Sequence, residues 1–469
     1  MFGTVDLRIQ CVFRAQPPHW RVLIHLSSTT LSGFNLAHET LNYRTMPFRL
    51  QQIQSVNRMN LHRVLLATLL LCSPLVVHAQ ISWSGIYDFE IKKGGTGSSL
   101  GWNQLPNDYI QLNVQNLQLF VDASIDDGIS LSAKIATNRQ TASDPRYLDL
   151  ELANVTFWHL VGNALNISAG KILTPFGAFT RRQLSPDNPL IGQPLFFYYQ
   201  TNVSPQTGYL DAAAAAYAQS SYGGMLSTIY NGGYYVGADA FGSFANDLIE
   251  YNIALMNSPL SSPNTSINLD KDLAFHGRVA VHPAIWGTLG FSYCTGSFLE
   301  HNSVNSFYDA LGGLGSFKQN TAGIDVTLSY LFYEINAEYI HNDYDAPYVV
   351  YDTSGYGWYR SGLPGNGSLT LSSDEVLVDV KIDLPFYPGL YVAGRYNTLS
   401  FGKIIDPYYL SSTYGQSISW DDDVQKYALG VGYKPAHGVL IKVGYEWTTI
   451  DVTPRPNLDV VAAQVSVSF

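Results

Sequence analysis

Charged side chains recur at every second position in segments whose alternate positions are apolar. In EVLVDVKIDL, residues 375–384, Asp379, Lys381 and Asp383 alternate with valine and isoleucine. This period of two is that of a β-strand with one apolar and one polar face. The charged face could line a pore for ions and small polar solutes, or it could face bulk water in a soluble sheet.

The sequence offers little for catalysis or for a metal site. It contains no H-E-x-x-H pair, and Cys294 is the only cysteine after residue 79. His276 lies two residues from Arg278 on one face of a predicted strand, which alone defines no reaction. We therefore expect no catalytic residue, no cofactor and no metal.

Residues 59–79, MNLHRVLLATLLLCSPLVVHA, have the organisation of a secretory signal peptide. A basic start at Arg63 leads into an apolar run from Val64 to Val77 and then to a small residue, Ala79. A spanning helix needs about 20 apolar residues, more than this run offers; a buried core helix is the alternative. We expect residues 1–58 to be an upstream extension outside the mature protein, which would cover residues 80–469.

The predicted mature chain is acidic. Seven of the 26 basic and two of the 37 acidic residues precede residue 80, which leaves 19 basic and 35 acidic residues. This balance argues against a nucleic-acid partner, since such proteins present basic surfaces. No stretch after Ala79 is long and apolar enough for a membrane helix, so the exported chain is either soluble or a β-barrel.

Alternating segments recur along the whole predicted mature chain. We predict about sixteen strands. Their starts lie near residues 81, 110, 129, 147, 164, 233, 248, 272, 286, 319, 333, 374, 390, 424, 438 and 459. Apolar faces often end in an aromatic residue, as in Tyr330, Tyr433 and Trp447, which is typical of the aromatic girdles of membrane barrels.

The connections also indicate a membrane barrel. Short turns such as 126–128 and 436–438 alternate with longer polar loops such as 298–318 and 344–371. We therefore predict an all-β fold: a transmembrane antiparallel β-barrel of about 16 strands with long extracellular loops and short periplasmic turns. The last strand, VVAAQVSVSF, should pair with the first, ISWSGIYDFEI, because an open edge inside lipid leaves backbone groups unsatisfied.

The longest irregular stretch follows the fifth predicted strand. We expect the loop 174–219 to fold into the barrel and to narrow the pore, with Arg181, Arg182 and Asp187 as its charged constriction. The alternative is an extracellular lid packed on its own aromatic side chains.

The stretch GKILTPFGAFTRRQLSPDNPLIGQPL, residues 170–195, resembles the segment after an early strand in the phosphate-selective porin O/P family. Elsewhere only the strand layout agrees. The resemblance implies sixteen strands and a homotrimer. The terminal Phe469 is similar to the C-terminal signature of bacterial outer-membrane proteins, which implies the outer membrane of a Gram-negative bacterium.

Phosphate selectivity in that family rests on dense arginine and lysine in the pore, from which this sequence departs. We predict a mixed, somewhat acidic lumen with a weak preference for cations, and salt bridges within the wall for some of its charges. The predicted pore-lining residues are Lys134, Asp149, Glu151, Glu250, Arg278, Asp325, Glu338, Asp379, Lys381, Asp383, Arg395, Lys442 and Glu446.

The sequence thus favours a porin for passive diffusion of small hydrophilic solutes or ions. Two alternatives remain: a non-conducting structural or adhesive barrel, and an outer-membrane hydrolase. The Tyr-rich stretch 345–362 could bind sugars or a partner protein, or simply pack a loop.

Overall fold

The computed structural model describes residues 80–95, 109–137, 148–211, 214–215, 225–230, 232–261, 272–300, 314–352, 357–359, 369–408, 411–452 and 455–469. The predicted signal peptide and residues 1–58 lie outside this part of the chain, so both assignments stay predictions.

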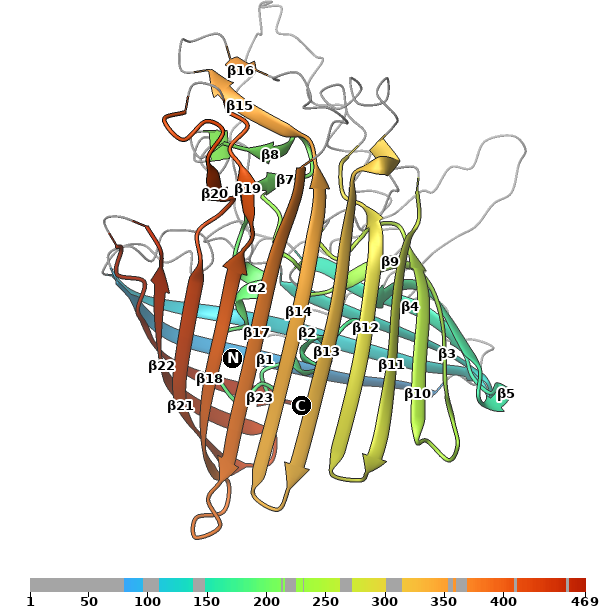
Figure 1. Ribbon diagram of the computed structural model, residues 1–469. Helices are drawn as coiled ribbons and strands as arrows, with labels where there is room; N and C mark the ends of the chain where they lie inside the picture. Colours follow the sequence, from blue (N-terminus) through green and yellow to red (C-terminus); the bar gives the residue numbers. More distant parts are fainter. Residues whose placement is uncertain are drawn as a thin grey trace, which may run out of the picture. The chain divides into compact units, whose positions relative to one another are not determined.

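Sixteen antiparallel strands form one closed barrel (Figure 1), which confirms the predicted fold class and strand number. The barrel strands are β1 (Gln80–Gly94), β2 (Ile110–Asp126), β3 (Ile129–Thr137), β4 (Leu148–Phe157), β6 (Asn166–Leu173), β9 (Tyr234–Phe244), β10 (Ile249–Met256), β11 (Ala274–Ala284), β12 (Gly287–Ser297), β13 (Lys318–Tyr330), β14 (Tyr333–Ala346), β17 (Leu369–Asp383), β18 (Leu390–Phe401), β21 (Val424–Ala436), β22 (Val439–Ile450) and β23 (Val460–Ser468).

The barrel closes between its first and last strands. β1 pairs with β23 from Ile86 opposite Ser468 to Gly94 opposite Val460. The terminal Phe469 takes part: its carbonyl accepts from Gly85 N–H at 2.8 Å, and its own N–H donates to Gly85 O at 3.1 Å. This pairing confirms the prediction, and it satisfies the two edges that an open sheet would expose to lipid.

The two faces of the strands differ as the period of two predicts. On β22, Ile441, Val443 and Tyr445 face outward and are exposed, whereas Lys442 faces inward and is buried. Other strands repeat this, with exposed outward side chains such as Trp83 and Phe291. So much exposed apolar surface is unfavourable in water and suits a lipid environment.

Connections at one end of the barrel are short and those at the other end are long. Only two residues separate β11 from β12, β13 from β14 and β21 from β22. Because the strand number is even, β1 begins and β23 ends on the side of the short turns. The connection from β4 to β6 on this side holds the short strand β5 (Leu160–Asn163).

Two small sheets lie among the long connections (Figure 1). One contains β7 (Val203–Ser204), β8 (Gly208–Leu210), β15 (Tyr348–Asp352) and β16 (Gly357–Tyr359), in the order β16-β15-β8-β7. The other pairs β19 (Lys403–Ile405) with β20 (Ser417–Ser419). The Tyr-rich stretch 345–362 thus supplies β15 and β16, and its suggested binding role stays a prediction.

The described helices are a single turn each: η1 (Phe179–Arg182), α2 (Leu195–Tyr198) and η2 (Leu314–Ser316). Within the described residues no helix is long and apolar enough to cross a bilayer.

Candidate functional site

The connection from β6 to β9, residues 174–233, enters the barrel, and we call it the inserted segment. In this segment, the Leu195 N–H donates to the side chain of Asn397 on β18, and the Ser185 hydroxyl donates to Asp88 on β1. Both wall partners are buried side chains on the inner face of the barrel. The helix α2 accordingly lies within the outline of the barrel in Figure 1.

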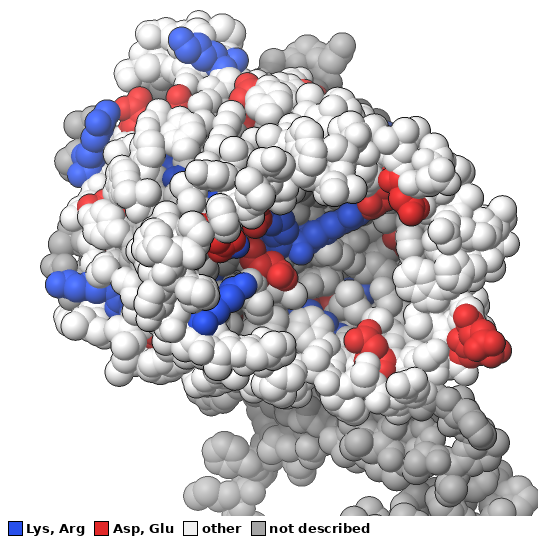
Figure 2. Space-filling view, turned by 90° about the horizontal axis from the view of Figure 1, so that it is seen from below, with Lys and Arg blue, Asp and Glu red and all other residues white. Residues whose placement is uncertain are grey.

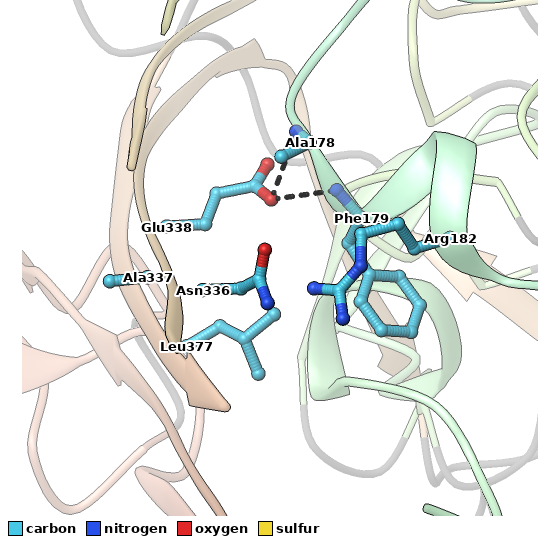
Figure 3. A pocket seen from close by; sticks show the side chains of 7 residues that line it. All are labelled: Ala178, Phe179, Arg182, Asn336, Ala337, Glu338 and Leu377. Carbon is cyan, nitrogen blue, oxygen red and sulfur yellow. Dashed lines mark hydrogen bonds between the residues drawn. The ribbon is translucent and has the colours of Figure 1, made fainter. Parts of the chain in front are cut away.

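Glu338 on β14 anchors the first turn of the inserted segment. One carboxylate oxygen accepts from Ala178 N–H at 3.3 Å and from Phe179 N–H at 3.2 Å (Figure 3). Gly177 precedes this turn at φ +67°, and a Cβ there would overlap the Glu338 carboxylate. Only glycine fits both the left-handed backbone and this close approach. A cavity of about 10 Å³ beside the turn is at the lower limit for one water molecule.

Arg181 and Arg182 follow on η1 and both form ion pairs. Arg181 lies 2.8 Å from Glu250 on β10, and Arg182 lies 2.6 Å from Glu334 on β14. Each glutamate is the second residue of its strand on the short-turn side, so the arginines point toward that mouth. Seen from this side, the barrel is hollowed, and Lys, Arg, Asp and Glu side chains gather inside the opening (Figure 2).

Asp187 is the third predicted constriction residue. It lies in the turn after η1, and its side chain is exposed. Partial burial raises the pKa of Asp187, and the charges of Arg182 and Lys434 oppose that rise. Arg182 thus acts on Asp187 through its charge, while its ion pair is with Glu334.

Three basic side chains of the wall hold the next part of the inserted segment through its carbonyl groups. Lys442 donates to the carbonyl oxygens of Ser185 at 2.9 Å, Asn188 at 3.0 Å and Leu190 at 3.2 Å. Lys426 donates to Gln193 O at 2.9 Å, and Arg395 to Gly192 O at 3.2 Å. Such charge-assisted bonds are about twice as strong as neutral ones. We call Lys442, Lys426 and Arg395 the carbonyl clamp.

Two further predicted pore-lining pairs are buried and bidentate. Arg278 reaches Asp325 at 2.6 and 3.2 Å. Arg395 reaches Asp379 at 2.6 and 2.8 Å. These four side chains and Glu338 are almost fully buried, because the inserted segment and neighbouring wall side chains lie over them. In this structure they form ion pairs between wall strands or hydrogen bonds to the inserted segment.

The outer part of the inserted segment is fixed to the extracellular connection after β18. Asp421 accepts from the Tyr199 hydroxyl at 2.9 Å and from Asn202 N–H at 2.7 Å. Burial raises the pKa of the Asp421 carboxyl to about 7, although these donors and Asp422 N–H favour its charged form. β8 also pairs with β15, so residues 203–210 lie among the extracellular connections.

Predicted lining residues on β4, β17 and β22 remain partly exposed, whereas Lys134 on β3 is buried. Glu151 pairs with Lys134 at 2.8 Å and is 27% exposed, whereas Lys134 is 3% exposed. Lys381 lies 3.1 Å from Asp383, and their exposed fractions are 19% and 51%. Glu446 lies 3.0 Å from Lys426 and is the more exposed of the two. Asp149 on β4 is partly exposed.

His276 shows no catalytic arrangement. Its ring is completely buried, with Nδ1 2.8 Å from Thr174 Oγ1 and Nε2 3.0 Å from Ser258 O. Both ring nitrogens therefore bind neighbouring polar atoms of the wall and the connections. The one G-x-S-x-G string of the sequence, residues 97–101, lies outside the described residues.

Sequence reasoning missed Asp421, Asn397 and Ser185 as contacts of the inserted segment. No motif marks them, because each acts through a partner about 100 to 220 positions away along the chain. The strand alternation did identify Lys442 and Arg395 as inward-facing, but it could not show which main-chain oxygens they reach.

No family model matches the chain, and no curated protein sequence matches it either. Solved structures do. The outer membrane channel DcaP of Acinetobacter baumannii matches with a TM-score of 0.53 and 11% identity, over 83% of this chain and 97% of that one. The anion-selective porin from Comamonas acidovorans matches with a TM-score of 0.50 and 8% identity, over 84% of this chain and 100% of that one.

Such low identities establish the fold alone. They support a porin-like barrel and do not bear on phosphate selectivity. With its closed sixteen-stranded wall and apolar outer surface, the chain has the fold of the porin barrels of the bacterial outer membrane.

Proposed function

We propose that the chain is an outer-membrane channel for passive diffusion of small hydrophilic solutes or ions, narrowed by the loop 174–219. The observation that carries this proposal is the inserted segment, which ion pairs and the carbonyl clamp hold inside a closed barrel. Fixed charged groups in a narrowed lumen act on passing ions through size and electrostatics and need no chemical conversion. Arg181, Arg182 and Asp187 are the proposed constriction residues.

We also propose a weak preference for cations. In four ion pairs the carboxylate is the more exposed partner: Lys134–Glu151, Arg182–Glu334, Lys381–Asp383 and Lys426–Glu446. Three pairs are exceptions, in which the basic side chain is the more exposed: Arg181–Glu250 with 42% and 34%, Lys92–Glu90 with 19% and 2%, and the buried pair Arg278–Asp325 with 5% and 1%. A solute in the lumen would therefore meet more negative than positive charge, which disfavours the phosphate-selective interpretation.

A non-conducting structural or adhesive barrel is the second candidate. An apolar core supports it, to which the described part of the chain contributes seventeen buried residues, including Leu195, Phe298 and Trp420. This core packs the inserted segment against β14, β17 and β18 and occupies part of the barrel. If it extended across the whole lumen, no solute would pass.

We propose a homotrimer, as the family resemblance implies. The outward side chains of neighbouring strands β4, β6 and β9 include Ala153, Ala169, Ala238 and Ala240. Small side chains let two barrels approach closely within a membrane. Mass measurement of the detergent-solubilised protein would give three protomers, and a monomer at all concentrations would contradict the proposal.

Single-channel recording of residues 80–469 in a planar bilayer, under a salt gradient, tests the channel function. Steady conductance with a modest cation bias is expected. Anion selectivity would overturn the charge argument and restore the phosphate interpretation, with Arg181 and Arg182 dominating the constriction. A folded barrel without conductance would favour the structural or adhesive role.

A further inference from the structure

The two sides of the inner wall differ in how far the inserted segment covers them. On the side from β14 to β22, inward charged side chains at mid-strand are almost fully buried. They include Glu338, Glu375, Asp379, Arg395, Lys426 and Lys442. Water has little access to this side at the level of these residues.

Above the buried charges, the same side is filled with apolar side chains. Leu195, Tyr199 and Val203 of the inserted segment belong to one buried cluster with residues of the wall and its connections. The wall members include Leu371 on β17 and Leu399 on β18. An ion or a hydrated solute would have to be desolvated to cross such a core, which is costly.

The opposite side, from β2 to β4, retains polar groups that water can reach. Asp122 is exposed and accepts from the Ser132 hydroxyl at 2.6 Å, so both side chains share one face. This is the inner face, because the neighbouring Leu131 is exposed on the outer face. Asp149, Glu151 and Asn154 on β4 are partly exposed. These groups extend along the wall, because Asp149 lies at the extracellular end of β4 and Asp122 lies near the short-turn end of β2.

The charge on this side is negative where a solute can touch it. Lys134, the basic residue between these carboxylates, is buried between Glu151 and Tyr234, and its ammonium also lies 4.9 Å from the Tyr234 ring centre. Its charge is therefore shielded from the lumen, and the carboxylates face it.

Resting on the proposed channel function, we infer that solutes cross between the inserted segment and β2–β4. Asp122, Asp149 and Glu151 there select small cationic solutes. The carbonyl clamp on the other side holds the inserted segment and takes no part in selection.

Paired cysteine variants test this path, because Cys294, the only cysteine of the predicted mature chain, is buried. Ser132→Cys places a thiol on β3 beside the proposed path. Ser466→Cys places one on β23, where Ser466 is almost fully buried and lies opposite Asp88. Both serines face inward and both changes are nearly isosteric, so each variant is the other's control.

A positively charged methanethiosulfonate reagent is added to both sides during single-channel recording in KCl. We expect a stepwise loss of conductance and a loss of cation preference in Ser132→Cys, and no response in Ser466→Cys. The path assignment would be overturned if the reagent lowered the conductance of Ser466→Cys and left that of Ser132→Cys unchanged. It would also be overturned if neither variant responded, or if both responded equally. If the unmodified folded protein does not conduct, the proposed function itself fails, and the path falls with it.

Charge removal gives an independent measurement in the same bilayers. Asp122→Asn should move the reversal potential toward that of a non-selective pore. Asp374→Asn, which removes an exposed carboxylate from the outer face of β17, should leave the reversal potential unchanged. An equal effect of the two changes would mean that overall charge, and not this wall, sets the preference.

Discussion

Replacing Lys442 with methionine tests how the wall holds the inserted segment. The ammonium group donates to three carbonyl oxygens of the turn 185–190, at distances from 2.9 to 3.2 Å. Methionine is a flexible apolar side chain of similar length, but it offers no donor. The three carbonyls would lose this partner at a position where the lysine is almost completely buried.

The size of the effect follows from two opposing terms. Each buried polar group left without a partner costs about 1–3 kcal/mol, so three would cost at most about 9 kcal/mol. The variant also removes the desolvation penalty of a buried ammonium, which is several kcal/mol. We therefore expect docking of the turn to weaken by about 2–4 kcal/mol. Because about 1.4 kcal/mol is tenfold in an equilibrium constant, the undocked population should rise about 30- to 700-fold.

Amide hydrogen exchange read by mass spectrometry measures this opening. Within the turn, Asp187 N–H and Asn188 N–H donate to Leu184 O at 2.9 and 2.8 Å, and Leu190 N–H donates to Asn188 Oδ1 at 3.2 Å. Where local opening of the turn limits exchange, the exchange rate of these amides should rise by the same factor as the undocked population.

Lys434→Met is the matched control: Lys434 on neighbouring β21 is exposed and acts on Asp187 of the same turn through its charge, so this variant removes a nearby charge without removing the three hydrogen bonds. It should leave exchange in the turn unchanged. Unchanged exchange in Lys442→Met, in a barrel whose thermal melting shows that it is folded, would refute the view that Lys442 holds the turn.

Three further predictions concern other contacts. Burial raises the pKa of Asp421 from 3.8 to about 7, so the folded loop binds a proton more tightly than the unfolded chain. The stability of this loop should therefore fall as the pH rises from about 4 to 7 and stay constant above pH 7. Protection of the amides of residues 420–423 from hydrogen exchange, corrected for intrinsic exchange rates, should show the same pH dependence. The Asp421→Asn variant should lose this pH dependence. Gly177→Ala should destabilise the first turn by about 1–3 kcal/mol, since it combines a left-handed backbone with overlap on Glu338; an unchanged melting temperature would contradict this. Arg395→Met should cost about 3–5 kcal/mol in denaturant unfolding by leaving Asp379 buried without its cation, and the double change with Asp379→Leu should recover most of that loss.

The barrel was predictable because every strand has to satisfy the same two-sided environment. Predicted starts at residues 110, 129, 333, 390 and 424 coincide with those of β2, β3, β14, β18 and β21. Lipid requires an apolar outer face over the membrane-spanning length of each strand. Apolar and polar residues therefore alternate over many positions with few interruptions. The β1–β23 pairing followed from the physical need to remove both edges.

The contacts of the inserted segment were not predictable in the same way. Its residues follow no period, and its partners are single side chains on strands far along the chain. The irregularities of the wall were also hidden: the register shifts between Asp88 and Phe89 and again between Lys134 and Ile135. Such shifts arise from local hydrogen bonding, which a pattern of apolar and polar letters does not record.

Counting inward charges along the strands therefore describes the wall, while selectivity depends on which of those charges a solute can reach. Lysine and arginine carry donors on long side chains, and main-chain carbonyls of an inserted segment can accept from them. Lys426 and Lys442 are buried in this way. Carboxylates can accept from the segment's N–H groups, as Glu338 does, but Asp122, Glu151 and Asp383 stay in contact with the lumen. The segment also covers carboxylates such as Glu338 and Glu375, so we expect selectivity to follow from the inner-wall charges that it leaves exposed and not from the total charge of the wall.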